Sequence, residues 1–379
     1  MHFNFLKKKV ITVFPPQKIK IKGRVLFSYI PEPVTWKSDD SRLGGHSNKW
    51  ESREIANIFL EQGYIVDAIS WLNSNTSLNT EYDYFFDIYT NLNKINFPNK
   101  RNTIKLLHLT GSYADYQNRA ELKRVKDFIE KTNLPYTPKR QVHDIENYKN
   151  SIKIADFCTL IGNQHTLNTF PKSIHNKITL VPVTASSLIS IKNKTNYLNN
   201  NREYLWFFGY GCVHKGLDIV MDYFINNTDK KLNIVGDIKL DNDFINAYGS
   251  YINNVNIKSY GYLDPNSDKF NEILNGCYAF IAPSCSESIS TSVVTCMTAG
   301  LYPLISIDTG VDLPNKCGIV LHDCSVKGIK DAIDALEKKS DKRIEYEINV
   351  VQNYALKNFS RSVFRDRMEY YFEEIIKNA

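Results

Sequence analysis

Two charged residues occupy loops of a kind that binds anions. Glu287 lies in the small polar run 284–292, which follows a short apolar run and precedes a helical pattern. Lys215 lies in the glycine-containing run 209–216, which has the same surroundings. A loop between a strand and a helix offers free backbone N–H groups to an anion, and a lysine beside it neutralises phosphate charge. The two runs therefore predict a binding site for a phosphorylated ligand.

The elements that must position these residues alternate between strand and helix. Apolar runs of strand length fall at residues 24–30, 64–70, 104–109, 155–161 and 178–182, and again at 204–208, 232–237, 257–263, 278–282, 301–306 and 318–321. Residues 82–88 predict a further strand at an edge of the first sheet. Alternation of this kind indicates parallel α/β sheets, in which ligands bind at the carboxyl ends of the strands. Glu287 and Lys215 are both expected at such an edge.

A helix is predicted from Ser47 or Asn48 to Gly63, where a glycine stops it. Its apolar positions are Trp50, Ile55, Ile58, Phe59 and Leu60, and this pattern leaves on the solvent side Glu51, Arg53, Glu54 and Glu61. With the strands on either side and the glycine loop before it, this helix resembles the opening of a Rossmann-like domain.

Composition is typical of a large enzyme with two domains. The chain has 379 residues, of which 42% are hydrophobic, and this suffices for two cores. The predicted division is a first domain at 1–183, an exposed polar linker at 184–203, a second domain at 204–355 and a terminal segment at 356–379. A net charge of +6 is a mild basic excess that suits anionic substrates or an acidic membrane surface. It is too small to indicate nucleic-acid binding.

Cysteine usage and the termini indicate a cytoplasmic protein. The seven cysteines are odd in number and scattered without Cys-x-x-Cys spacing, so we expect reduced thiols and no zinc site. The basic lead 1–22 lacks the features of a secretory signal, and no apolar run reaches membrane-spanning length. The pair Asp241 and Asp243 precedes a helical pattern, so we interpret it as a polar helix cap and expect no metal site.

The stretch around Glu287 resembles the donor-site signature of GT-B glycosyltransferases. The pattern is a Pro-Ser pair, then Glu287, then a helix ending in x-Met-x-x-Gly at Gly300. The resemblance is to the retaining, nucleotide-sugar-dependent enzymes of glycosyltransferase group 1, similar to family 4. It implies that Glu287 acts as a catalytic residue that contacts the donor sugar. It also implies a donor-binding role for the residues of the following turn, which are Ser288, Ile289, Ser290 and Thr291.

Two positions depart from that signature. Thr295 stands where the family has a second glutamate that holds the ribose hydroxyls, so it is expected to offer the donor a hydroxyl but no carboxylate. In the glycine loop that starts at Gly209, Lys215 matches the family's lysine, but Tyr210 replaces its arginine. The loss of a planar guanidinium removes bidentate phosphate recognition. We therefore expect weaker donor affinity, or an arginine supplied from elsewhere in the chain.

In the first domain the resemblance implies that Gly44 and Gly45 face the donor diphosphate, whereas by themselves they are typical of a turn that needs positive φ. It also implies that His108, at a strand end, is catalytic near the donor sugar, with His46 as the alternate on the acceptor side. A strand-end histidine is also a common structural residue. Further along, Asn118 and Arg124 are candidates for the acceptor side, although a charged run is usually a solvated helix face.

Taken together, the resemblance implies two Rossmann-like domains facing across a cleft, with a C-terminal helix that crosses back to the first domain. The implied function is a metal-independent glycosyltransferase of hexosyltransferase type, which moves a sugar from a UDP- or GDP-sugar to a hydroxyl of a bacterial surface glycan or glycolipid in polysaccharide biosynthesis. No cofactor is expected. The basic lead permits peripheral contact with the inner membrane face, and the sequence indicates no oligomeric state.

Two alternatives remain on the same scaffold. The replacements at Tyr210 and Thr295 are compatible with a glycosyltransferase-like partner subunit that has lost turnover. A sugar-nucleotide epimerase ranks below it, because Lys215 and Glu287 fit the transferase pattern better. Fold alone does not separate these functions.

Overall fold

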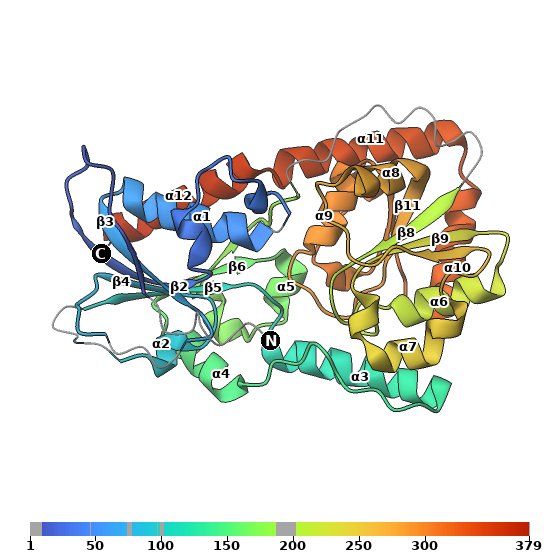
Figure 1. Ribbon diagram of the computed structural model, residues 1–379, viewed down its shortest axis with the longest axis horizontal. Coiled ribbons are helices and arrows are strands. Elements are labelled where there is room, and N and C mark those ends of the chain that lie inside the picture. Colours follow the sequence, from blue (N-terminus) through green and yellow to red (C-terminus); the bar gives the residue numbers. More distant parts are fainter. Residues whose placement is uncertain are drawn as a thin grey trace.

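The computed structural model describes residues 10–45, 47–73, 78–96, 98, 102–186 and 202–378, which form two α/β domains (Figure 1). The first domain is built on a seven-stranded sheet with the order β1-β3-β2-β4-β5-β6-β7. Its strands are β1 (Ile11–Val13), β2 (Gly23–Tyr29), β3 (Tyr64–Ser70), β4 (Tyr84–Asp87), β5 (Ile104–Leu109), β6 (Phe157–Ile161) and β7 (Ile178–Val181). Only β1 pairs in the antiparallel direction among these described strands. The sheet is therefore of the parallel type that the alternating pattern predicts.

Helices cover both faces of this sheet. They are α1 (Ser47–Glu61), α2 (Asn91–Lys94), α3 (Ala114–Thr132), α4 (Ile145–Ile154) and α5 (Gln164–Asn168), with short 3-10 turns at Glu32–Thr35, Ser41–Leu43 and Lys172–Lys177. The prediction that residues 82–88 lie at an edge is wrong, because β4 pairs with β2 on one side and β5 on the other. All four residues of β4 are buried, which agrees with an interior strand.

The second domain has a fully parallel sheet with the order β10-β9-β8-β11-β12-β13. Its strands are β8 (Glu203–Phe207), β9 (Lys231–Val235), β10 (Ile257–Ser259), β11 (Cys277–Ala282), β12 (Tyr302–Ile305) and β13 (Ile319–Val320). In chain order this is the 3-2-1-4-5-6 arrangement of Rossmann domains, whose order reverses between β8 and β11. The loops after those two strands carry Lys215 and Glu287, so both lie at the switch point where such sheets bind ligands.

The helices of the second domain are α6 (Leu217–Asn226), α7 (Asn242–Tyr248), α8 (Asp268–Gly276), α9 (Thr291–Thr298) and α10 (Val326–Glu337), and 3-10 turns lie at Ile238–Leu240, Gly249–Tyr251, Ile307–Thr309 and Pro314–Lys316. Asp241 caps α7, as predicted, because its carboxylate accepts the N–H of Phe244 at 3.3 Å. Asp243 pairs with Lys139 of the first domain at 2.8 Å. Both carboxylates thus have structural roles.

Two C-terminal helices tie the domains together. The first, α11 (Asp341–Asn358), packs on α9 and β12, and the second, α12 (Arg361–Asn378), packs on α1 and β7 (Figure 1). Aromatic rings hold α12 in place, with Phe372 4.5 Å from Phe59. Glu54, expected in solvent, is buried where Arg365 of α12 binds it. The predicted helix that crosses back to the first domain is confirmed.

A second connection is made by a segment of the first domain that reaches over to the second. Helix α3 and the loop after it, residues 114–143, extend from the first domain along α6 and α7 of the second (Figure 1), and we call this segment the interdomain arm. Lys131 binds Asp218 at 3.0 Å and Asp222 at 2.6 Å, both on α6. Tyr136 donates to Asp241 at 2.5 Å. The arm therefore fixes the second domain at a distance from the covalent linker.

All seven cysteines are free thiols, as predicted, and all but Cys324 are buried. Within the part of the chain that the structure describes, no helix is long and apolar enough to cross a bilayer. Because none of the seven cysteines forms a disulfide, packing, ion pairs and the chain itself hold the two domains together.

Candidate functional site

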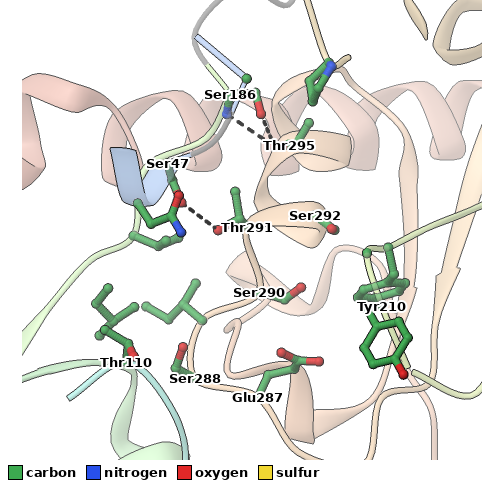
Figure 2. Close-up of a pocket in the computed structure, with 18 of the residues that line it drawn as sticks. Ser47, Thr110, Ser186, Tyr210, Glu287, Ser288, Ser290, Thr291, Ser292 and Thr295 are labelled. Atoms are coloured by element: carbon green, nitrogen blue, oxygen red, sulfur yellow. Dashed lines mark hydrogen bonds between the residues drawn. The ribbon is translucent and has the colours of Figure 1, made fainter. Parts of the chain in front are cut away.

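A cavity of about 580 Å³ lies between the two domains and is lined by both. On the first-domain side it is reached by the end of β2, the start of α1 and the end of β5, and on the second-domain side by the loops after β8 and β11. The carboxyl edges of both sheets thus face the same space. Figure 2 shows Ser47 and Thr110 of the first domain across this space from Glu287, Ser290 and Tyr210 of the second.

Lys215 and Glu287 meet in this cavity as an ion pair between the loops after β8 and β11. Only 6% of Lys215 is exposed, and burial lowers the pKa of its ammonium below the ordinary value although Glu287 acts against that shift. Burial acts to raise the pKa of the Glu287 carboxyl, but the charges of Lys215, His214 and Arg140 outweigh it and hold that pKa low. A carboxylate and an ammonium thus stand side by side where a ligand enters.

The backbone around the pair is fixed by close packing. Gly216 has a left-handed φ of 73°, and a Cβ there would lie 2.6 Å from Cγ of Pro283, so only glycine fits. The carbonyl of Glu287 accepts a hydrogen bond from the hydroxyl of Ser112 in the first domain, at 2.5 Å. A Cβ on Gly310 would lie 1.5 Å from the carbonyl oxygen of Ser288, which shows how tightly the next turn supports the Glu287 loop.

Helix N-termini converge on the same space. The hydroxyls of Ser47, which begins α1, and Thr291, which begins α9, lie 3.3 Å apart across the domain interface (Figure 2). The N-cap residue of α9, Ser290, makes no side-chain cap hydrogen bond, and Gly216 before α6 has no side chain that could make one. The first N–H groups of these helices carry partial positive charge, which favours an anion in the cavity.

Most residues predicted to bind the donor line the cavity: Gly45, Gly209, Tyr210, Lys215, Ser288, Ile289, Ser290, Thr291 and Thr295. A Cβ on Gly209 would meet no atom within 4 Å, so this glycine leaves open space for a ligand. Gly44 does not line the cavity, and a Cβ there would lie 2.5 Å from Nδ2 of Asn266. Neither Gly44 nor Gly45 has a positive φ, so the interpretation that this turn needs one is wrong. Their small size instead makes room for the 264–266 loop.

Thr295 faces the segment that leaves the first domain. Its hydroxyl accepts the N–H of Ser186 at 3.3 Å and donates to the Ser186 hydroxyl at 3.4 Å (Figure 2). Thr295 itself is fully buried. The hydroxyl expected to face the donor is therefore engaged in a contact between the second domain and residue 186.

His108 does not reach the cavity, which corrects the prediction of a catalytic role. Its ring is fully buried in the first sheet, where Nδ1 lies 2.6 Å from the Thr159 hydroxyl and the ring stacks near Phe86. Burial lowers its pKa to about 3, so the ring stays neutral at physiological pH. Tyr29, 6.3 Å away between ring centres, lines the cavity in its place.

The predicted acceptor-side residues belong to the interdomain arm. The side chain of Asn118 donates to the carbonyl of Val142 at 2.9 Å and accepts the N–H of the same residue at 2.8 Å. Arg124 is buried and donates to the carbonyl of Pro283 at 3.0 Å. Neither lines the cavity, so their acceptor-side role is corrected to support of the arm. His46 lies outside the described residues.

The sequence prediction missed both charged residues that line the cavity from the first domain. Glu51 of α1 is 2% exposed, and burial raises the pKa of its carboxyl to about 7, against the opposing hydrogen bond from Thr184. Helical spacing placed it in solvent, since the segment that covers it is distant in sequence. Arg140, in the loop of the interdomain arm, also lines the cavity. No local motif marks it, although the missing motif arginine had indicated that one could come from elsewhere.

Comparison with solved structures identifies the fold. Sucrose-phosphate synthase from Thermosynechococcus elongatus is similar with a TM-score of 0.58 and 12% identity, over 92% of this chain and 82% of that chain. The Anabaena protein HepE in complex with UDP-glucose gives 0.55 and 11%, over 93% and 100%. A glycosyltransferase from Rickettsia africae gives 0.52 and 13%, over 94% and 99%. The chain thus has the predicted GT-B fold, with two Rossmann-like domains facing a cleft.

Part of the sequence also matches a known protein family. Residues 191–351 match the family described as glycosyl transferases group 1. The matched stretch covers most of the second domain and contains both Lys215 and Glu287. No curated protein sequence is similar enough to count as a match.

Proposed function

We propose that this protein transfers a sugar from a UDP- or GDP-sugar to a hydroxyl group of a glycan or glycolipid at the bacterial surface. The observation that carries the proposal is the meeting of Lys215 and Glu287, from two separate loops, inside a cavity between the domains. A complex of the similar protein HepE contains UDP-glucose, which supports a nucleotide sugar as the donor.

The ion pair suggests how the donor is bound. A donor diphosphate competes with Glu287 for the ammonium of Lys215, and the donor sugar gives Glu287 new partners, because its hydroxyls donate to the carboxylate. Both charges stay compensated when the donor replaces their mutual contact. As the bond between the sugar and the diphosphate breaks, the leaving group gains negative charge, which Lys215 and the N-terminus of α9 stabilise.

We further propose that this transfer needs no divalent metal, since Lys215 and the helix N-termini supply positive charge at the diphosphate. The corresponding test is transfer in the presence of a chelator. Activity that persists in excess EDTA supports the proposal, and activity that is lost and then restored by Mg²⁺ or Mn²⁺ contradicts it.

The test of the main proposal is release of nucleotide from a panel of UDP-, GDP- and ADP-sugars. We expect slow hydrolysis of one donor by the purified protein, and hydrolysis too slow to detect by the Glu287→Ala and Lys215→Ala variants. Lys231→Ala is the matched control, because Lys231 is exposed on β9 and does not line the cavity. Loss of activity in that control as well would point to unfolding or general charge effects and not to the cavity.

A partner subunit without turnover is the second candidate. It is favoured by the engagement of the Thr295 hydroxyl with Ser186 and by the absence of a cation at Tyr210. Binding of one nucleotide sugar without release of nucleotide, even when extracts containing glycan and glycolipid acceptors are supplied, would support this candidate. Appearance of an epimerised donor would instead support an epimerase.

A further inference from the structure

Arg140 brings a cationic side chain to the cavity from the first domain. It lines the cavity together with Lys215 and Glu287, and its side chain is exposed. Within the described ranges its guanidinium forms no ion pair, whereas Arg24 and Arg365 bind carboxylates. A guanidinium that faces an anion-binding cavity without a protein partner is available to a ligand.

Arg140 also lies beside the loop that lacks the motif arginine. Gly211 follows Tyr210 and has a φ of 97°, and a Cβ there would lie 2.8 Å from Cγ of Arg140. The stem of Arg140 therefore crosses the loop one residue from Tyr210, where an arginine of that loop would begin. Its charge acts on the pair in the cavity, because it lowers the pKa of both Lys215 and Glu287.

The backbone of Arg140 is held from the side of α3. Its N–H donates to the carboxylate of Glu121 at 2.7 Å, and its carbonyl accepts a hydrogen bond from Gln117. Glu121 also accepts the N–H of Lys139 at 2.9 Å, and it is buried. Side chains one helical turn apart on α3 thus clamp the peptide groups on both sides of Arg140.

The arm that carries Arg140 is itself docked on the second domain. Asp243 of α7 accepts the N–H of Thr137 at 3.0 Å and binds the ammonium of Lys139 at 2.8 Å. Nearby, Tyr136 donates to Asp241 at 2.5 Å. Arg140 is therefore positioned against the glycine loop by contacts on both of its sides.

We propose that Arg140 binds the diphosphate of the donor together with Lys215, in place of the motif arginine that Tyr210 replaces. This inference rests on the proposed function, because it assumes a nucleoside diphosphate in the cavity. The planar guanidinium supplies the bidentate recognition of phosphate that a lysine alone lacks. The diphosphate site is then shared between the domains, and it is complete only while the interdomain arm is docked on the second domain.

The test is calorimetric titration of the full chain with UDP and GDP, and with UMP and GMP as probes that lack the second phosphate. For Arg140→Ala we expect diphosphate affinity to fall on the order of tenfold to a hundredfold, as for a lost hydrogen bond to a charged group. Monophosphate affinity should change by less than about threefold. Arg140→Lys should recover part of the loss, and Arg140→Ala with Tyr210→Arg should recover most of it.

Arg119→Ala is the matched control, because Arg119 is exposed on α3 of the same interdomain arm and does not line the cavity. Equal diphosphate affinity in wild type and Arg140→Ala would overturn this inference and leave the proposed function intact. So would equal losses for UDP and UMP, or an equal loss in Arg119→Ala. If the wild-type chain bound none of the nucleoside diphosphates, the proposed function would fail, and this inference with it.

Discussion

The two sides of the cavity are built in different ways. On the second-domain side, Lys215 and Glu287 each lie in the loop between a strand and the next helix, so short stretches of sequence determine their positions. On the first-domain side, Glu51 lies on a helix face and Arg140 lies on an arm that reaches over to the other domain. One side is set by local turns and the other by packing between distant segments.

The site therefore contains two kinds of residue: those whose position follows from a local motif, and those that contacts between distant segments bring to the cavity. A strand, a glycine loop and a helix fix where a side chain points before any tertiary contact is made. A residue such as Arg140 reaches the site only because Glu121 and Asp243 hold its loop. The missing arginine at Tyr210 is therefore no evidence that the site lacks a second cation.

Removal of the motif cation should have the largest effect. For Lys215→Ala we expect kcat/KM for nucleotide release to fall on the order of 10² to 10³-fold, because the leaving diphosphate loses its nearest charge. The variant leaves Glu287 buried without its nearest cation, so the pKa of that carboxyl should rise, because burial is then opposed only by the charges of His214 and Arg140. Steady-state kinetics with the preferred donor measures the loss.

A Lys215→Ala variant with less than about a threefold loss would contradict a diphosphate role for this residue. Glu287→Gln is the companion variant, since it keeps the size of the side chain and removes its charge. Thermal unfolding of both variants checks that lost activity does not reflect a lost fold.

A pH experiment tests the first-domain side. Burial raises the pKa of Glu51 from 4.5 to about 7, so the folded chain keeps a proton that the unfolded chain releases. This stabilising contribution is complete below about pH 4.5 and is lost as pH rises through 7, by about 3 kcal/mol at most. The charge of Arg361 and the hydrogen bonds of Thr184 oppose the shift. Glu51→Gln should therefore flatten the pH dependence of stability.

Urea unfolding of wild type and Glu51→Gln at several pH values between 5 and 8 measures this difference. The control is Glu130→Gln, which changes an exposed glutamate on α3. A wild-type slope that persists unchanged in Glu51→Gln would show that another group titrates in this range.

The second sheet and its site could be predicted from the sequence because apolar runs mark its strands and glycines mark its turns. The run at 278–282 and Thr295 in the helix after it fell where the structure has β11 and α9. The predictions that are wrong concern residues whose surroundings come from elsewhere in the chain. Helical spacing cannot tell solvent from a cavity, so Glu51 was placed in water, and a strand-end position cannot tell a sheet edge from its core, so His108 was placed at the donor.

A substitution in the interdomain arm, with a smaller expected effect, tests how the first domain positions the guanidinium of Arg140. Glu121→Ala leaves the N–H groups of Lys139 and Arg140 without their acceptor, so we expect roughly tenfold weaker binding of the preferred nucleoside diphosphate. Glu121→Gln keeps an acceptor oxygen and should lose little. Calorimetric titration measures both.

The decisive measurement is the double variant Glu121→Ala with Arg140→Ala. If Glu121 acts by positioning Arg140, the double variant should bind no more weakly than Arg140→Ala alone. Losses that add in full would mean that Glu121 affects the site by another route.

The smallest effect is expected at Thr295, a motif position whose side chain makes a structural contact with Ser186. Thr295→Val keeps the shape of the side chain and removes the hydroxyl, so the N–H and hydroxyl of Ser186 lose a partner at a cost of about 1 kcal/mol. Nucleoside diphosphate affinity should change by less than about threefold, because this hydroxyl already has Ser186 as its hydrogen-bond partner. Thermal unfolding and titration with the preferred nucleoside diphosphate give the two values. A drop in affinity as large as that of Arg140→Ala would show that Thr295 has kept a direct role in donor binding, and that the two sides of the cavity differ less than their construction implies.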